Sequence, residues 1–203
     1  MNELLSQLHK ERMDRTEKFR NIVIDNHIFE ILEKPGAAVG SKLWIGGEEL
    51  SIFLHRNPEL IQGKSILELG AGVGLVSIVC SLFSDRVICS DKGEVLEIAR
   101  ENIRRNRNSA QVLEYGWSEN SVGIFDVIVG SDIVYYDHDF VPLYQALMAN
   151  SRVGTIFILS YRDRLYSMLD FFPLLKNDFV VREERKITNE SYVYIYERVG
   201  RET

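Results

Sequence analysis

The chain contains 203 residues, enough for one domain with a full hydrophobic core and too few for two. Hydrophobic residues make up 45% and charged residues 27%, as in ordinary soluble globular proteins. The formal net charge of −6 argues against a nucleic-acid partner, because phosphate binding needs clustered Lys and Arg. The one basic run, Arg100 to Arg107, is interpreted as the solvated face of a helix.

The sequence predicts a cytoplasmic protein, with the nucleus as the alternative. Residues 1–20 are polar and charged, unlike a signal peptide, and no apolar run reaches transmembrane length, so no membrane partner is expected. Cys80 and Cys89 each lie in an apolar run, which is typical of buried thiols in a reducing compartment. No Cys/His cluster has metal-ligand spacing, so no metal site is expected.

Residues 1–40 are predicted to form an extension that packs on the main domain, residues 41–203, in a single-domain protein. Leucines at helical spacing predict a short helix over 2–18. The runs 19–24 and 27–32 are strand-like and flank an Asp-Asn pair, which is typical of a hairpin turn.

From residue 41 onward, predicted strands alternate with predicted helices. The strands are 65–69, 86–89, 110–113, 124–129 and 155–159; the helices are 46–55, 73–83, 93–106, 140–148 and 164–172; a closing strand pair covers 178–182 and 191–198. Alternation of this kind indicates parallel β-α-β units with right-handed crossovers. The fold class is therefore predicted as α/β, a Rossmann-like doubly wound sheet of seven mostly parallel strands with an antiparallel C-terminal pair.

A glycine-rich loop, Glu68-Leu69-Gly70-Ala71-Gly72-Val73-Gly74, follows the first core strand. Ligands of open α/β sheets bind beyond the carboxyl ends of the strands, so this loop is a candidate binding site. Its G-x-G-x-G spacing differs from the G-x-G-x-x-G of dinucleotide sites, which argues against a pyrophosphate ligand. The acidic Glu68 suits a ligand that carries an ammonium or sulfonium cation.

Asp91 ends the second core strand, 21 residues after Gly70. An acid at this place chelates the ribose hydroxyls of an adenosyl ligand. The alternative is an N-cap for the helix predicted over 93–106, a role that Asp also performs well. The glycine loop at the right distance upstream favours the ribose interpretation.

The glycine loop and Asp91 together resemble the class I, seven-β-strand, S-adenosylmethionine-dependent methyltransferases. Gly130-Ser131-Asp132-Ile133-Val134-Tyr135 resembles the Asp-x-x-Tyr signature of the non-histone protein-lysine methyltransferases of that fold. Trp117 after the third strand and Trp44 before a helix resemble two further elements of this family, the methyltransferase family 16 type. The resemblance covers roughly residues 40–198.

The resemblance implies a set of site residues. The residues implied around S-adenosylmethionine, and its product S-adenosylhomocysteine, are Trp44, Glu68, Gly70, Ala71, Gly72, Asp91, Trp117 and Ser131. Asp132 and Tyr135 are implied in catalysis: Asp132 accepts hydrogen bonds from the incoming ammonium, and Tyr135, with Tyr136, offers a π-face. The alternatives are core packing for Trp117, a helix or turn cap for Asp132, and packing at the sheet edge for Tyr135.

The predicted function is methyl transfer to a lysine of a cytosolic protein, of which chaperones and translation factors are possible examples, by a monomeric enzyme. Other acceptors are open on the same fold: protein histidine or arginine, a protein N-terminus, a small amine or RNA. A non-catalytic binding module and a nicotinamide oxidoreductase are the alternatives from other classes.

Overall fold

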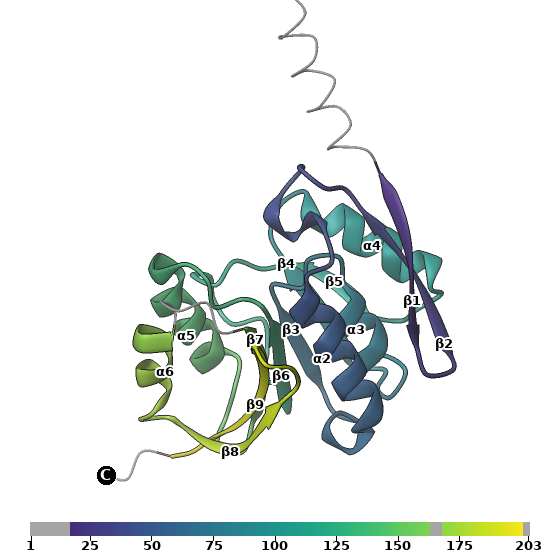
Figure 1. The fold of residues 1–203 in the computed structure, drawn as a ribbon. Coiled ribbons are helices and arrows are strands. Elements are labelled where there is room, and N and C mark those ends of the chain that lie inside the picture. The colour runs from purple at the N-terminus through teal and green to yellow at the C-terminus, as the bar shows by residue number, and fades with distance from the viewer. Residues whose placement is uncertain (1–16, 163–167, 201–203) are drawn as a thin grey trace, which may run out of the picture.

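The computed structural model describes residues 17–162 and 168–200, and a seven-stranded sheet runs through them (Figure 1). Its strands are β3 (Ile66–Leu69), β4 (Val87–Asp91), β5 (Gln111–Glu114), β6 (Val127–Ser131), β7 (Ile156–Arg162), β8 (Phe179–Lys186) and β9 (Ser191–Arg198). The order across the sheet is β5-β4-β3-β6-β7-β9-β8. The first five strands in that order pair in parallel, whereas β9 runs antiparallel between β7 and β8. The predicted fold class is confirmed.

Successive strands are added to the sheet in one direction after β3 and in the opposite direction from β6 onward. From β3 the chain moves outward through β4 to β5, and it then returns to place β6 on the other side of β3. The loops that follow β3 and β6 therefore separate, and they leave a crevice at the carboxyl edge of the sheet. The glycine-rich loop and Asp132 follow these two strands.

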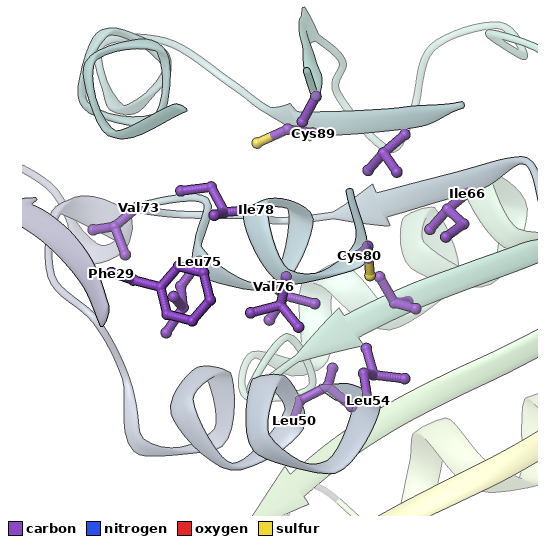
Figure 2. Packing of buried hydrophobic residues seen from close by; sticks show 14 of the residues in the cluster. Phe29, Leu50, Leu54, Ile66, Val73, Leu75, Val76, Ile78, Cys80 and Cys89 are labelled. Atoms are coloured by element: carbon purple, nitrogen blue, oxygen red, sulfur yellow. The ribbon is translucent and has the colours of Figure 1, made fainter. Parts of the chain in front are cut away.

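Helices cover both faces of the sheet. They are α2 (Ile45–Arg56), α3 (Leu75–Cys80), α4 (Val95–Arg105), α5 (Phe140–Ala149) and α6 (Met168–Leu175). On one face, α2, α3 and α4 share an apolar cluster, and Figure 2 shows Leu50 and Leu54 of α2 pointing toward Val76 and Cys80 of α3. On the other face, side chains of α5 and α6 pack against β7 in a second cluster.

The two cysteines are buried and free within the first cluster, as their apolar neighbours in the sequence predict. The basic run of α4 is also confirmed as a solvated face. Arg104 and Arg105 pair with Glu101 one turn earlier, and Arg105 also pairs with Glu30 of the neighbouring hairpin. These arginines are thus partnered on the protein surface.

The N-terminal extension contains the predicted hairpin, β1 (Lys18–Ile24) and β2 (His27–Glu33). Asn102 of α4 docks it, because the Asn102 amide oxygen accepts from the Leu32 N–H and the amide nitrogen donates to the Leu32 carbonyl. The same amide nitrogen donates to the carbonyl of Val73 in the glycine-rich loop. One buried side chain therefore joins the hairpin, α4 and the candidate site. The helix predicted over 2–18 lies almost wholly outside the described residues.

Several predicted boundaries are wrong for local reasons. The helix predicted over 73–83 is the shorter α3, because Gly74 has a φ of +83° and belongs to the preceding loop. The strand predicted over 178–182 continues to Lys186, because an edge strand can carry charged residues on its exposed side. The strand predicted over 124–129 begins only at Val127, and Ile124 is 51% exposed before it. Part of the helix predicted over 164–172 lies outside the described residues.

Candidate functional site

A cavity of about 800 Å³ opens at the carboxyl edge of the sheet. The predicted site residues that line it are Trp44, Gly70, Ala71, Gly72, Asp91, Trp117, Ser131, Asp132 and Tyr135. Residues that lie up to 91 positions apart in the sequence, from Trp44 to Tyr135, thus meet around one space. Glu68 is the one predicted site residue that is not among the lining residues.

The glycine-rich loop is held by close contacts that exclude side chains. Gly72 has a φ of +56°, and a Cβ there would lie 3.0 Å from the carbonyl oxygen of Gly40. Gly70 has a φ of +64°, and a Cβ there would lie 2.8 Å from Cγ2 of Ile133. Glycine is the residue that adopts these backbone angles without steric cost. The loop is therefore confined between the segment before α2 and the segment after β6.

Asp91 holds this loop from the neighbouring strand. Its Oδ2 accepts from the N–H of Gly72 at 2.8 Å, and its Oδ1 accepts from the N–H of Lys92 at 2.7 Å. Burial raises the pKa of Asp91, and the two backbone donors act in the opposite direction. The alternative of an N-cap is wrong, because Glu94 occupies the N-cap position of α4. Each carboxylate oxygen accepts more than one hydrogen bond, so Asp91 can also bind a diol.

Glu68 faces the core behind the loop and is only 1% exposed. Its Oε2 accepts from the N–H of Ser77 at 2.9 Å and from the Ser77 hydroxyl at 2.5 Å. Gly74, at the N-cap position of α3, provides no side-chain cap, so Glu68 satisfies a free N–H in the first turn of that helix. The structure thus places Glu68 as a support of the loop and not in the cavity, in contrast to the prediction from the sequence.

The burial of Glu68 predicts a pH dependence of stability. Burial raises the pKa of Glu68 to about 8, against an ordinary value of 4.5. Between these values the folded protein keeps a proton that the unfolded chain releases, so the free energy of unfolding falls as pH rises, by up to about 1.4 kcal/mol per pH unit. Glu68→Gln imitates the protonated carboxyl and removes this contribution.

We therefore expect Glu68→Gln to gain stability relative to the wild type between pH 5.5 and pH 8. Urea unfolding of both proteins at pH 5.5, 6.8 and 8 measures this difference. A difference in unfolding free energy that is equal at all three pH values would show that Glu68 is already ionised in the folded protein at pH 5.5.

Asp132 lies directly after β6 and caps a helix that is distant in sequence. Its Oδ2 accepts from the N–H of Gly46, in the first turn of α2, at 3.0 Å. A Cβ on Gly46 would lie 2.7 Å from Cγ of Asp132, so glycine is what allows this approach. Asp132 has a φ of +52°, a conformation that Asp and Asn tolerate better than other side chains. The cap proposed as an alternative from the sequence therefore describes one contact of Asp132, and the same residue also lines the cavity.

Aromatic rings continue from Asp132 toward the mouth of the cavity. The Tyr135 and Tyr136 rings lie 4.6 Å apart between centroids, and Tyr136 stacks on His138 at 5.3 Å. Tyr136, His138 and Asp139 also line the cavity. Sequence analysis did not identify His138 or Asp139 as site residues. Both residues follow closely after the Asp132-x-x-Tyr135 signature, and this closeness is the signal that could have identified them.

The two tryptophans lie on the walls of the cavity. Nε1 of Trp44 donates to the carbonyl of Val39 at 2.9 Å, and Nζ of Lys42 lies 4.1 Å from the Trp44 ring centroid. Trp117 packs against the second apolar cluster and lies close to Gly70. Trp117 therefore both packs against the core and lines the cavity. Its neighbours in the sequence are polar, so the sequence alone gives no sign of these apolar contacts.

Two further observations concern metals and membranes. Within residues 17–162 and 168–200, no group of three or more His, Cys, Asp or Glu side chains could hold a metal ion. Among the same residues, no helix is both long enough and apolar enough to cross a membrane.

Comparisons with known proteins agree with the geometry. The lysine methyltransferase family matches residues 23–178. Protein N-lysine methyltransferase METTL21A of Danio rerio is 32% identical over 189 residues, which cover 88% of this chain and 84% of the relative. Protein-lysine methyltransferase METTL21E of Mus musculus is 32% identical over 158 residues, which cover 71% of this chain and 65% of the relative.

Solved structures share the fold at low sequence identity. The T. thermophilus 16S rRNA N2 G1207 methyltransferase RsmC, in complex with AdoMet and guanosine, has a TM-score of 0.69 and 18% identity, over 91% of this chain and 51% of that chain. A methyltransferase from Pyrococcus furiosus has a TM-score of 0.65 and 17% identity, over 98% of both chains. The family resemblance read from the sequence is confirmed, and this chain belongs to the lysine methyltransferase family.

Proposed function

We propose that the chain transfers methyl groups from S-adenosylmethionine to lysine side chains of a protein substrate. The observation that carries this proposal is the meeting of two sets of residues around one cavity. Gly70, Gly72 and Asp91 lie on the β3–β4 side, and Asp132 and Tyr135 lie on the β6 side. The names of the relatives, protein N-lysine methyltransferases, support the same acceptor.

The residues on the β3–β4 side fit the cofactor. Gly70 and Gly72 line the cavity and have no side chains, so a ligand can approach the bare main chain there. Asp91 is a partly buried carboxylate suited to two vicinal hydroxyls, and Trp44 and Trp117 offer flat apolar walls. When bound, the cofactor supplies an electrophilic methyl carbon on a positively charged sulfur.

The residues on the β6 side fit an ammonium group. Gly46 holds one oxygen of Asp132, which orients the carboxylate toward an incoming lysine. The faces of Tyr135 and Tyr136 attract a cation and exclude water. A lysine ammonium has an ordinary pKa of about 10.4 and must lose a proton before it reacts, and an apolar surrounding lowers that pKa. Positioning of the free amine then supplies much of the rate.

The location in the cell and the kind of substrate belong to this proposal. A substrate in the cytosol, such as a chaperone or a translation factor, and action as a monomer remain predictions from the sequence. A protein histidine, arginine or N-terminus, or a small amine, is the alternative acceptor, because this fold does not determine the nucleophile.

The test combines binding with product analysis. Calorimetric titration with S-adenosylmethionine and S-adenosylhomocysteine should show micromolar binding of both. Incubation with a cell extract and tritiated S-adenosylmethionine, followed by amino-acid analysis, should then place the label in methyllysine. Label that appears only in histidine, arginine or nucleic acid would overturn the lysine assignment. Absence of binding would point to a non-catalytic module.

A further inference from the structure

The cavity is lined by charged side chains of both signs. Its carboxylates and lysines are Asp91, Glu119, Asp132, Asp139, Lys42 and Lys92. The methionine part of S-adenosylmethionine carries an ammonium and a carboxylate, so a site that fits it offers a cation as well as acids. The ammonium can find a partner among several acids, whereas the carboxylate must find one among far fewer cations.

The ammonium of Lys42 contacts an aromatic ring instead of a carboxylate. Its Nζ lies 4.1 Å from the centroid of the Trp44 ring, and both residues line the cavity. Within residues 17–162 and 168–200, Lys42 forms no ion pair. The π-face attracts the ammonium but carries no net charge, so the positive charge and the N–H donors of Lys42 stay available to an anion.

The backbone is fixed on both sides of Lys42. The carbonyl of Ser41 accepts from the N–H of Lys34 at 2.8 Å, and the N–H of Leu43 donates to Oε1 of Glu33 at 2.6 Å. The end of the hairpin therefore holds this stretch of chain in place. Because the main chain is fixed and the ammonium rests on a ring, this lysine loses less conformational freedom on binding an anion than one on a free loop.

Lys42 belongs to the segment that spans the two ends of the cofactor site. Just before it, Gly40 packs on the glycine-rich loop, and a Cβ on Gly40 would lie 3.3 Å from Cα of Gly72. Just after it, the N–H of Gly46 donates to Asp132. The sulfur of the cofactor must lie between the ribose site beside Gly72 and the acceptor carboxylate of Asp132. The methionine carboxylate is joined to that sulfur by a short methylene chain, so it stays near this segment.

Lys92 and His138 are the alternative cations, and each lies beside an acid. Lys92 directly follows Asp91, the residue proposed to bind the ribose. Burial raises the pKa of Asp91, and two backbone donors and the charge of Lys92 oppose that rise. His138 lies beside Asp139, with 3.7 Å between Nε2 and Oδ2. Lys92 is therefore at the ribose end of the site, and His138 has a carboxylate next to it.

We propose that Lys42 binds the carboxylate of the methionine part of the cofactor. The inference rests on the proposed function, because it takes the ribose site and the acceptor site from there. It adds a contact that S-adenosylmethionine and S-adenosylhomocysteine both make and that an adenosyl ligand without a carboxylate cannot make. The segment that contacts the glycine-rich loop and Asp132 then also holds the cofactor itself.

The test removes the positive charge from the protein and the carboxylate from the ligand, separately and together. Calorimetric titration is done with S-adenosylhomocysteine and with its decarboxylated analogue, which keeps the amine and lacks the carboxylate. The proteins are the wild type, Lys42→Met and the matched control Lys92→Met, because methionine keeps an unbranched stem without the charge. Thermal unfolding verifies that each variant is folded.

We expect the wild type to bind S-adenosylhomocysteine about tenfold more tightly than the decarboxylated analogue, which is the size of one charged hydrogen bond at an exposed site. Lys42→Met should lose about tenfold in affinity for S-adenosylhomocysteine and stay within about twofold for the analogue. Lys92→Met should leave the ratio of the two dissociation constants as it is in the wild type.

Three results would overturn the assignment of Lys42 and leave the proposed function standing. The wild type could bind both ligands equally, Lys42→Met could weaken both ligands equally, or the preference for the carboxylate could disappear in Lys92→Met and survive in Lys42→Met. A wild-type protein that binds neither ligand would instead overturn the proposed function.

Discussion

Asp132→Asn is expected to lower the turnover of lysine methylation about 100-fold, which corresponds to the loss of a charged hydrogen bond to the substrate nitrogen. The affinity for S-adenosylmethionine should stay within about threefold of the wild-type value, because the residues proposed to hold the cofactor lie on the β3–β4 side of the cavity. Steady-state kinetics on a substrate protein and calorimetric titration measure the two quantities.

The choice of Asn separates the charge of Asp132 from its structural contact. Asn keeps an amide oxygen that can accept from the Gly46 N–H, and it tolerates the positive φ of this position. Asp132→Ala removes both the charge and the cap, so it should also cost about 1 kcal/mol of unfolding free energy. An Asn variant with full turnover would show that Asp132 acts only as a cap of α2. Equal losses of turnover and cofactor affinity would make it a cofactor ligand.

Asp91→Ala is expected to weaken S-adenosylmethionine and S-adenosylhomocysteine binding about 100-fold each. The variant loses charged hydrogen bonds to the ribose hydroxyls, each worth about 1.5–3 kcal/mol. It also releases the Gly72 N–H, which the wild-type carboxylate holds at 2.8 Å, so the loop itself becomes less well positioned. Calorimetric titration with both ligands measures the effect.

The control for Asp91 is Asp91→Asn. Its amide oxygen can still accept from Gly72, so the loop contact survives while the charge and one acceptor are lost. The loss of affinity in Asp91→Asn would report the contact with the ligand. Any further loss in Asp91→Ala would report the contact that holds the loop. A dissociation constant unchanged in both variants would refute the ribose role of Asp91.

The segment that joins the extension to the main domain connects the two halves of the site. Residues 38–46 contact the glycine-rich loop through Gly40 and Gly72, and they reach Asp132 through Gly46. Trp44 and Lys42 of the same segment line the cavity between these contacts. The glycine-rich loop and the carboxylate of Asp132 are therefore both held by one short stretch of chain. Glu33 of the hairpin supports that stretch by accepting from the Leu43 N–H at 2.6 Å.

The sequence alone determined the architecture and most of the residues around the cavity. Alternation of apolar strands and amphipathic helices reports which face of each element is buried, and this local periodicity was sufficient to predict a mostly parallel sheet with an antiparallel C-terminal pair. The carboxyl ends of parallel strands lie on one edge, so Gly72, Asp91 and Asp132 could be placed together from their positions after strands.

Only the tertiary structure decided the direction and the partners of individual side chains. Glu68 and Asp91 are both acids near the ends of neighbouring strands, but Glu68 turns into the core to meet Ser77 and Asp91 faces the cavity. Asp132 caps a helix 86 residues earlier, and Gly46 is small for that reason. Such contacts leave no periodic signal, because a hydrogen bond or a close approach depends on where two distant segments meet in space.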